Sequence, residues 1–169
     1  THLVFAGDRA AEFELRLQGK SYLEILAAGG GILSTVRATR ASGVDQLVAR
    51  SRARALRMLA HGTTTAEAKS GYGLELSAEL DQLETLIRLD EAGPLEIVPT
   101  FLGAHAVPPE AHGDVSAYAH LVVEEMLPRV QRWYRSSGFA KRGIPLFNDV
   151  FCEMNAFSLE QSRRILEKG

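Results

Sequence analysis

The chain contains 169 residues, of which 46% are hydrophobic and 24% are charged, and its formal net charge is −2. This balance is typical of a folded globular protein and excludes a disordered chain. The weak net charge gives no electrostatic reason to expect a nucleic acid or a membrane surface as a partner, so a small-molecule substrate is the expected partner.

The first residues of the chain have the composition of a β-strand, and this strand is expected to begin before Thr1. Thr1 to Phe5 are rich in β-branched and apolar side chains, and no initiating Met precedes them. We therefore expect the chain to be a fragment of a longer protein. The single cysteine, Cys152, excludes an internal disulfide framework and fits a reducing compartment such as the cytoplasm.

Helical spacing of apolar residues then recurs along the chain. Residues 44–60 form an amphipathic pattern that ends at Gly62, a residue type suited to the position after a helix. Within a longer predicted helix, Pro128 predicts a kink or break near Leu127. The predicted helices cover 21–28, 44–60, 78–92, 114–135 and a segment that starts at Ser158 with a capping-box pattern to Gln161.

Short β-rich runs alternate with these helices. Counting Thr1–Val4, the predicted strands number about four, and residues 136–147 are expected to be a connecting loop. The other three predicted strands cover 63–68, 96–102 and 149–153. Such alternation predicts a parallel sheet with right-handed crossovers, which is either a small doubly wound sheet or part of a (β/α)8 barrel.

Polar side chains follow every predicted strand. In both architectures ligands bind at the carboxyl ends of strands, so these residues are candidates for a catalytic face, although strand ends also carry polar residues without function. The candidates at these ends are His2, Arg9, Glu67, Lys69, Tyr72, His105, Glu153 and Asn155.

Four of these candidates have competing interpretations. His2 could be half of a metal-binding H-x-H pair, whose other member would precede Thr1, or a structural histidine. Arg9 could grip a carboxylate or form a loop salt bridge to Asp8 or Glu12. Lys69 could be a desolvated base, but pairing with Glu67 is favoured. His105 is the best of the five histidines as a ligand or hydrogen-bonding group.

Cys152 has a simpler expectation. It lies in the apolar run Val150-Phe151-Cys152, which predicts a buried, inert thiol rather than a nucleophile.

Several stretches together resemble one family, the imidazolonepropionases, which are metal-dependent amidohydrolases of histidine degradation. EAKSGYGL and GAHAVP are the most specific of them. The matching stretches are residues 1–9, Tyr22, 29–32, 37–40, 67–74, 103–108 and 149–153.

The resemblance implies a (β/α)8 barrel of amidohydrolase type, of which this chain would supply about four βα units. It implies hydrolysis of 4-imidazolone-5-propanoate to N-formimino-L-glutamate with one Zn or Fe ion. His2 matches a metal ligand of the family. Substrate-binding positions of the family are matched by Arg9, Tyr22, Tyr72 and His105.

The same resemblance places other parts of the site outside the chain. The general base and the remaining metal ligands would lie before Thr1 or beyond Gly169, so residues 1–169 would be a partial hydrolase domain that is inactive in isolation. The open edges of half a barrel would favour a homo-oligomer. Two alternatives stay open: another amidohydrolase acting on a cyclic amide or a nucleobase, and a non-catalytic α/β module.

Overall fold

A parallel sheet of three strands forms the centre of the molecule in a computed structural model, which describes residues 1–21, 24–25, 29–93, 95–154 and 156–169. The strands are β1 (Thr65–Lys69), β2 (Glu96–Ala104) and β3 (Phe147–Val150), and β2 lies between the other two. Both pairings are parallel. The expected α/β class is therefore confirmed, and the strands form an open sheet.

The expected strand at Thr1–Val4 is not formed, although this segment lies beside β1. The backbone N–H of Lys69 donates to the carbonyl of Thr1 at 2.7 Å. The next carbonyls accept from a side chain instead, because the Arg54 guanidinium donates to Leu3 O at 2.9 Å and Phe5 O at 2.7 Å. The side chain of Arg54 thus makes the hydrogen bonds to these carbonyls, in place of the strand pairing that the β-rich pattern predicts.

Helix predictions made from apolar spacing are confirmed closely. The pattern over 44–60 corresponds to α4 (Val44–Ala60), and that over 78–92 corresponds to α5 (Leu76–Glu91). Ser158 caps α9 (Leu159–Lys168) through the expected capping box. The predicted helix at 21–28 includes residues 22–23 and 26–28, which lie outside the described residues.

The long helix after β2 is interrupted where the proline predicted it. It consists of α6 (Val115–Leu121), the π-helical segment η2 (Val122–Met126) and α7 (Leu127–Ser136), which has Pro128 in its first turn. Because proline lacks a backbone N–H, the hydrogen-bond ladder has to shift around it, and a π-helical segment is one way to do so.

Four short or exposed elements had not been predicted. They are α1 (Ala10–Leu17), α3 (Ile32–Arg40), the 3-10 turn η1 (Pro109–Ala111) and α8 (Gly138–Lys141). The last of these lies inside the stretch 136–147 that was expected to be a loop. Among the described helices, none has the length and apolar composition needed to cross a membrane.

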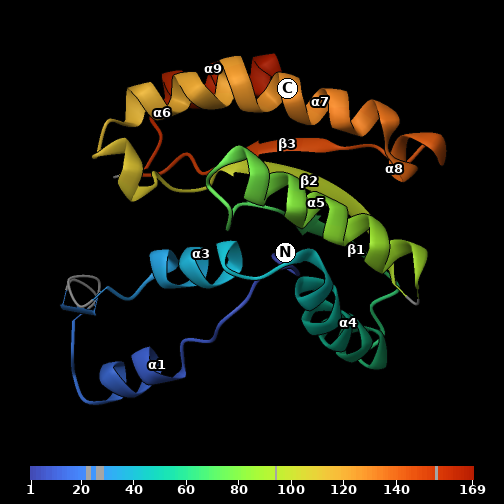
Figure 1. Cartoon of the computed structure of the whole chain (residues 1–169). Helices are drawn as coiled ribbons and strands as arrows, with labels where there is room; N and C mark the ends of the chain where they lie inside the picture. The colour runs from blue at the N-terminus through green and yellow to red at the C-terminus, as the bar shows by residue number, and fades with distance from the viewer. Residues whose placement is uncertain (22–23, 26–28, 94, 155) are drawn as a thin grey trace.

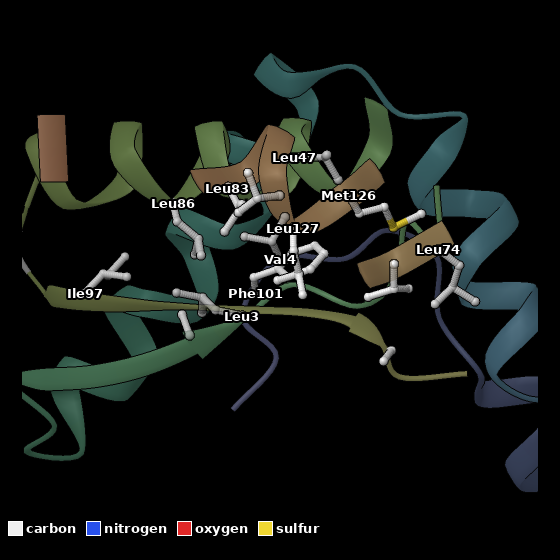
Figure 2. Packing of buried hydrophobic residues seen from close by; sticks show 14 of the residues in the cluster. Leu3, Val4, Leu47, Leu74, Leu83, Leu86, Ile97, Phe101, Met126 and Leu127 are labelled. Carbon is white, nitrogen blue, oxygen red and sulfur yellow. The ribbon is translucent and has the colours of Figure 1, made fainter. Parts of the chain in front are cut away.

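The helices cover one face of the sheet and leave its other face polar. Ala66 and Ala68 of β1 are buried, whereas Glu67 between them is exposed. Figure 2 shows Leu83 and Leu86 pointing from α5 toward β2, and all of the labelled side chains there belong to the buried core. In Figure 1, α5 runs along β1 and β2, and α7 lies along β3. The candidate residues therefore gather on the opposite face and at the strand ends.

Candidate active site

Three ring side chains from separate segments meet at the carboxyl ends of β1 and β2. The His2 ring stacks on the His105 ring with 4.5 Å between centroids, and Tyr72 lies 4.6 Å from His2 and 5.4 Å from His105. Phe5 and Phe151 approach this cluster edge-on, at 6.1 Å from Tyr72 and 6.0 Å from His105. Three of the predicted site residues thus form one cluster with an aromatic border.

His2 is positioned by two helices that hold the segment carrying it. Arg54 of α4 binds the carbonyls on either side of Val4, and its guanidinium lies 3.9 Å from the centroid of the Phe5 ring. From α3, the Thr39 hydroxyl accepts the backbone N–H of Ala6 at 3.1 Å. Burial, assisted by the nearby His105, lowers the pKa of His2 to about 4. His2 is therefore neutral near pH 7.

The loop that carries Tyr72 is shaped by two buried residues of α5. The Glu79 carboxylate accepts the backbone N–H groups of Gly71, Gly73 and Leu74 at 2.8–2.9 Å. Gln82 accepts the N–H of Tyr72 at 3.2 Å. Sequence reasoning missed both residues. The only available signal was a carboxylate in the first turn of a helix that directly follows a glycine-rich loop.

His105 is tied to the same loop, which defines its tautomer. Its Nδ1 lies 2.9 Å from the carbonyl oxygen of Gly71. A carbonyl can only accept, so Nδ1 carries the hydrogen and Nε2 of the neutral ring is left as an acceptor. Burial raises the pKa of Tyr72, an effect that the positive charge of Arg9 partly offsets. The Tyr72 hydroxyl therefore remains a proton donor at neutral pH.

The polar face of the sheet lies next to this cluster of rings. Lys69 lies 2.6 Å from both Glu67 and Asp149, and the Thr100 hydroxyl donates to Glu67 at 2.8 Å. Burial lowers the pKa of Lys69, but the two carboxylates outweigh burial and raise it. The expected Glu67–Lys69 pair is confirmed, and a charged, doubly paired lysine is a poor general base.

Arg9 is not brought into the ring cluster by any described contact, and its guanidinium pairs with a neighbour. Its Nε and Nη2 lie 2.8 and 2.7 Å from the Glu12 carboxylate, which is the loop salt bridge considered above. Arg9 nevertheless acts on the pKa of Tyr72, so the two residues share one electrostatic environment. Tyr22 lies outside the described residues, so its predicted role stays a prediction.

The end of the third strand differs from expectation. β3 ends at Val150 rather than Glu153, and Cys152 is a free, exposed thiol. The prediction of a buried cysteine was wrong: Phe151 keeps one backbone hydrogen bond to Ala104 of β2, but its side chain and that of Cys152 are exposed beyond the end of β3. Glu153 is also exposed, and Asn155 lies outside the part of the chain that the structure describes.

His2 has the properties of a metal ligand, and it offers one coordinating group. Its Nδ1 is buried without a hydrogen-bond partner, and a neutral imidazole has a free lone pair for a metal ion. Among the described residues, no three His, Cys, Asp or Glu side chains gather where they could hold a metal ion. The donor chemistry thus fits one ligand of a site that would need others.

The chain resembles curated imidazolonepropionases along its whole length. It is 58% identical to that of Chloroflexus aggregans over 167 residues, which cover 99% of the chain and 39% of the relative. It is 54% identical to that of Herpetosiphon aurantiacus and 53% identical to that of Brevibacillus brevis, in each case over all 169 residues.

These matches confirm the resemblance that the sequence motifs indicated. The chain spans 36–39% of the length of the curated relatives that it matches. No protein-family model matches the chain.

Proposed function

From the identity of 50–58% to curated imidazolonepropionases, we propose that the chain is part of an enzyme of this type. The enzyme opens the ring of 4-imidazolone-5-propanoate with water and releases N-formimino-L-glutamate. One structural observation carries the proposal: His2, Tyr72 and His105 converge at the carboxyl ends of parallel strands. We further propose that β1, β2 and β3 belong to a (β/α)8 barrel, where catalytic sites occupy this end.

The residues of the cluster have complementary roles in this reaction. Tyr72 donates a hydrogen bond to the ring carbonyl oxygen and stabilises the negative charge that develops there. His105 accepts a ring N–H at Nε2, because its Nδ1–H is held by the carbonyl of Gly71. Arg9 and Tyr22 bind the propanoate end, and the guanidinium of Arg9 pairs with the carboxylate.

The metal ion proposed for this enzyme is zinc or iron. His2 would hold it through an imidazole nitrogen, together with ligands from outside this chain. When bound, such an ion lowers the pKa of a water molecule to about 7 and so supplies the nucleophile. We place the enzyme in the cytoplasm, in keeping with its free thiol at Cys152.

The function is tested with the full-length protein that contains these residues. Purified protein should convert 4-imidazolone-5-propanoate, with N-formimino-L-glutamate identified by mass spectrometry. His2→Ala should lose bound metal by elemental analysis and lose turnover with it. Activity on hydantoin or a nucleobase but not on the imidazolone would favour the alternative amidohydrolase.

The 169-residue chain provides a second test. We expect it to show no turnover and weak metal binding, because one imidazole cannot retain the ion alone. Robust hydrolysis by this chain would contradict the placement of the other ligands outside it. Size-exclusion chromatography should show self-association through open sheet edges, and a clean monomer would count against the half-barrel.

A further inference from the structure

We propose that Glu79 is the positioning residue of this site, because its carboxylate sets the conformation of the loop 70–74 and, through Gly71, the orientation of His105. The activity measurements that test this inference rest on the proposed function, whereas the spectroscopic measurements are independent of it. Glu79 lies in the first turn of α5, and its described side-chain hydrogen bonds go to backbone N–H groups of the loop rather than to the three rings.

Glu79 is a buried acceptor whose two oxygens both receive hydrogen bonds from the loop. The side chain is 0% exposed, and both of its oxygens accept backbone N–H groups. Oε1 binds the N–H groups of Gly73 and Leu74 at 2.8 Å, and Oε2 binds that of Gly71 at 2.9 Å. A buried carboxylate is tolerated only when such bonds compensate its lost hydration, so the loop and the carboxylate stabilise each other.

The loop conformation held in this way is one that the backbone does not favour. Gly71 has φ of +107°, and Leu74 has φ of +53° although it carries a side chain. The carbonyl of Leu74 also faces the hydroxyl of Tyr118 at 3.1 Å, and that hydroxyl lies 2.8 Å from Gly103 O. Strained backbone persists where the surroundings over-determine it, and Glu79 accepts three of the five backbone N–H groups of this loop.

Gly71 connects the carboxylate of Glu79 to the ring of His105. The N–H of Gly71 donates to Glu79, and the carbonyl of Gly71 accepts from Nδ1 of His105 at 2.9 Å. Moving Gly71 would therefore release His105 from a single tautomer and rotate its ring. The neighbouring Tyr72 N–H is held by Gln82, so the phenol ring shifts with the same loop.

The chemistry also explains why a glutamate is needed rather than a glutamine. All three partners are N–H donors, so the side chain must be an acceptor at both ends. A glutamine would turn an NH2 group toward one of these N–H groups and leave two donors facing each other. Glu79→Gln should therefore displace the loop while changing side-chain volume very little.

The experiment compares Glu79→Gln with two matched variants of α5 in the full-length protein. Glu84→Gln makes the same chemical change at a half-exposed position, where Glu84 pairs with Arg88 at 3.4 Å. Leu86→Ala removes a fully buried core side chain and lowers stability without touching the loop. Thermal unfolding ranks the three variants by stability, so that loss of function can be compared at similar loss of stability.

The first measurement is the tautomer of His105, from nitrogen-15 NMR of histidine-labelled protein. Wild type, Glu84→Gln and Leu86→Ala should show protonated Nδ1, whereas Glu79→Gln should show a mixture of both tautomers. The second is kcat/KM for 4-imidazolone-5-propanoate, which should fall about 100-fold in Glu79→Gln with metal content unchanged. Leu86→Ala should retain the wild-type value.

The proposal is overturned if Glu79→Gln keeps both the wild-type tautomer and the wild-type kcat/KM. It is also overturned if Leu86→Ala loses as much activity as Glu79→Gln at the same stability. If wild type does not hydrolyse the imidazolone, the proposed function fails, and the tautomer measurement still decides the role of Glu79.

Hydrogen exchange in wild type decides the case in which Glu79→Gln fails to fold. The amides of Gly71, Gly73 and Leu74 should exchange as slowly as those of the α5 core, because a buried carboxylate holds them. Exchange as fast as that of exposed Gly113 would overturn the proposal.

Discussion

Two segments of this molecule carry proposed substrate-binding residues, and they are held in place very differently. The loop 70–74, with Tyr72, is anchored to the buried side of α5 by four backbone N–H bonds to Glu79 and Gln82. The segment around Arg9 leads into α1, a helix without buried residues that stands apart from the sheet in Figure 1.

This difference indicates how the two ends of a substrate would be recognised. The residues proposed to face the reacting ring are preorganised by the core, which would favour stabilisation of developing charge. The carboxylate end would meet Arg9, whose described partner is Glu12, in a salt bridge near the surface of the kind worth at most about 1 kcal/mol. The Arg9 segment can therefore adapt to the ligand at little cost in stability.

A substitution that disrupts the anchored loop should be the most damaging. An added Cβ on Gly71 would lie 2.8 Å from Leu102 O and 3.0 Å from the Cβ of His105, at φ of +107°. We expect Gly71→Ala to lower the free energy of unfolding by about 3 kcal/mol, as measured by urea denaturation. Gly62→Ala is the control, because it has φ of +91° but open space around it, and it should cost about 1 kcal/mol. Equal losses in the two variants would show that close packing of the loop is unimportant.

A substitution in the exposed segment should affect binding and leave stability alone. Arg9→Met removes a guanidinium but keeps an unbranched apolar side chain. We expect KM for 4-imidazolone-5-propanoate to rise about 10- to 100-fold, since a hydrogen-bonded charge pair is worth about 1.5–3 kcal/mol. The free energy of unfolding should change by less than about 0.5 kcal/mol. An unchanged KM would remove Arg9 from the substrate site and would favour a substrate without a carboxylate.

The smallest effect concerns the polar sheet face beneath the anchored loop. Burial raises the pKa of Glu67, but hydrogen bonds from Lys69, Thr100 and the terminal ammonium of Thr1 together outweigh it and lower that pKa to about 2 from an ordinary value of 4.5. The folded state therefore binds this proton less readily than the unfolded state, and the resulting stability is present above pH 4.5 and lost as the pH falls toward 2.

Comparing wild type with Glu67→Gln tests this account. The stability difference between them in urea denaturation should be largest at pH 7 and should shrink below pH 4.5. A difference that stays constant down to pH 3 would mean that Glu67 does not contribute as a charged group.

Elements with a strong local pattern were predictable, and those without one were not. The bounds of α4 match its apolar spacing, and Pro128 marked the start of α7, because both signals lie within a few residues of the feature they determine. By contrast, α1 was not predicted; it has only eight residues and buries none of them. Cys152 was misassigned because β3 ends three residues before the expected strand end, and boundaries depend on the neighbouring strand.

In the candidate site, too, some features were predictable from local sequence and others were not. Residues of the chain could be named in advance where strand ends and motifs mark them, as for His2, Tyr72 and His105. The contacts that hold them could not, because they join distant positions: Arg54 reaches Leu3 across 51 residues, and Lys69 reaches Asp149 across 80. Local composition and periodicity thus determined the order and type of the elements and the residues at their ends. Only the packing of β1, β2, α4 and α5 decided which buried groups would hold those residues, because a hydrogen bond inside a core depends on three-dimensional proximity rather than on sequence spacing.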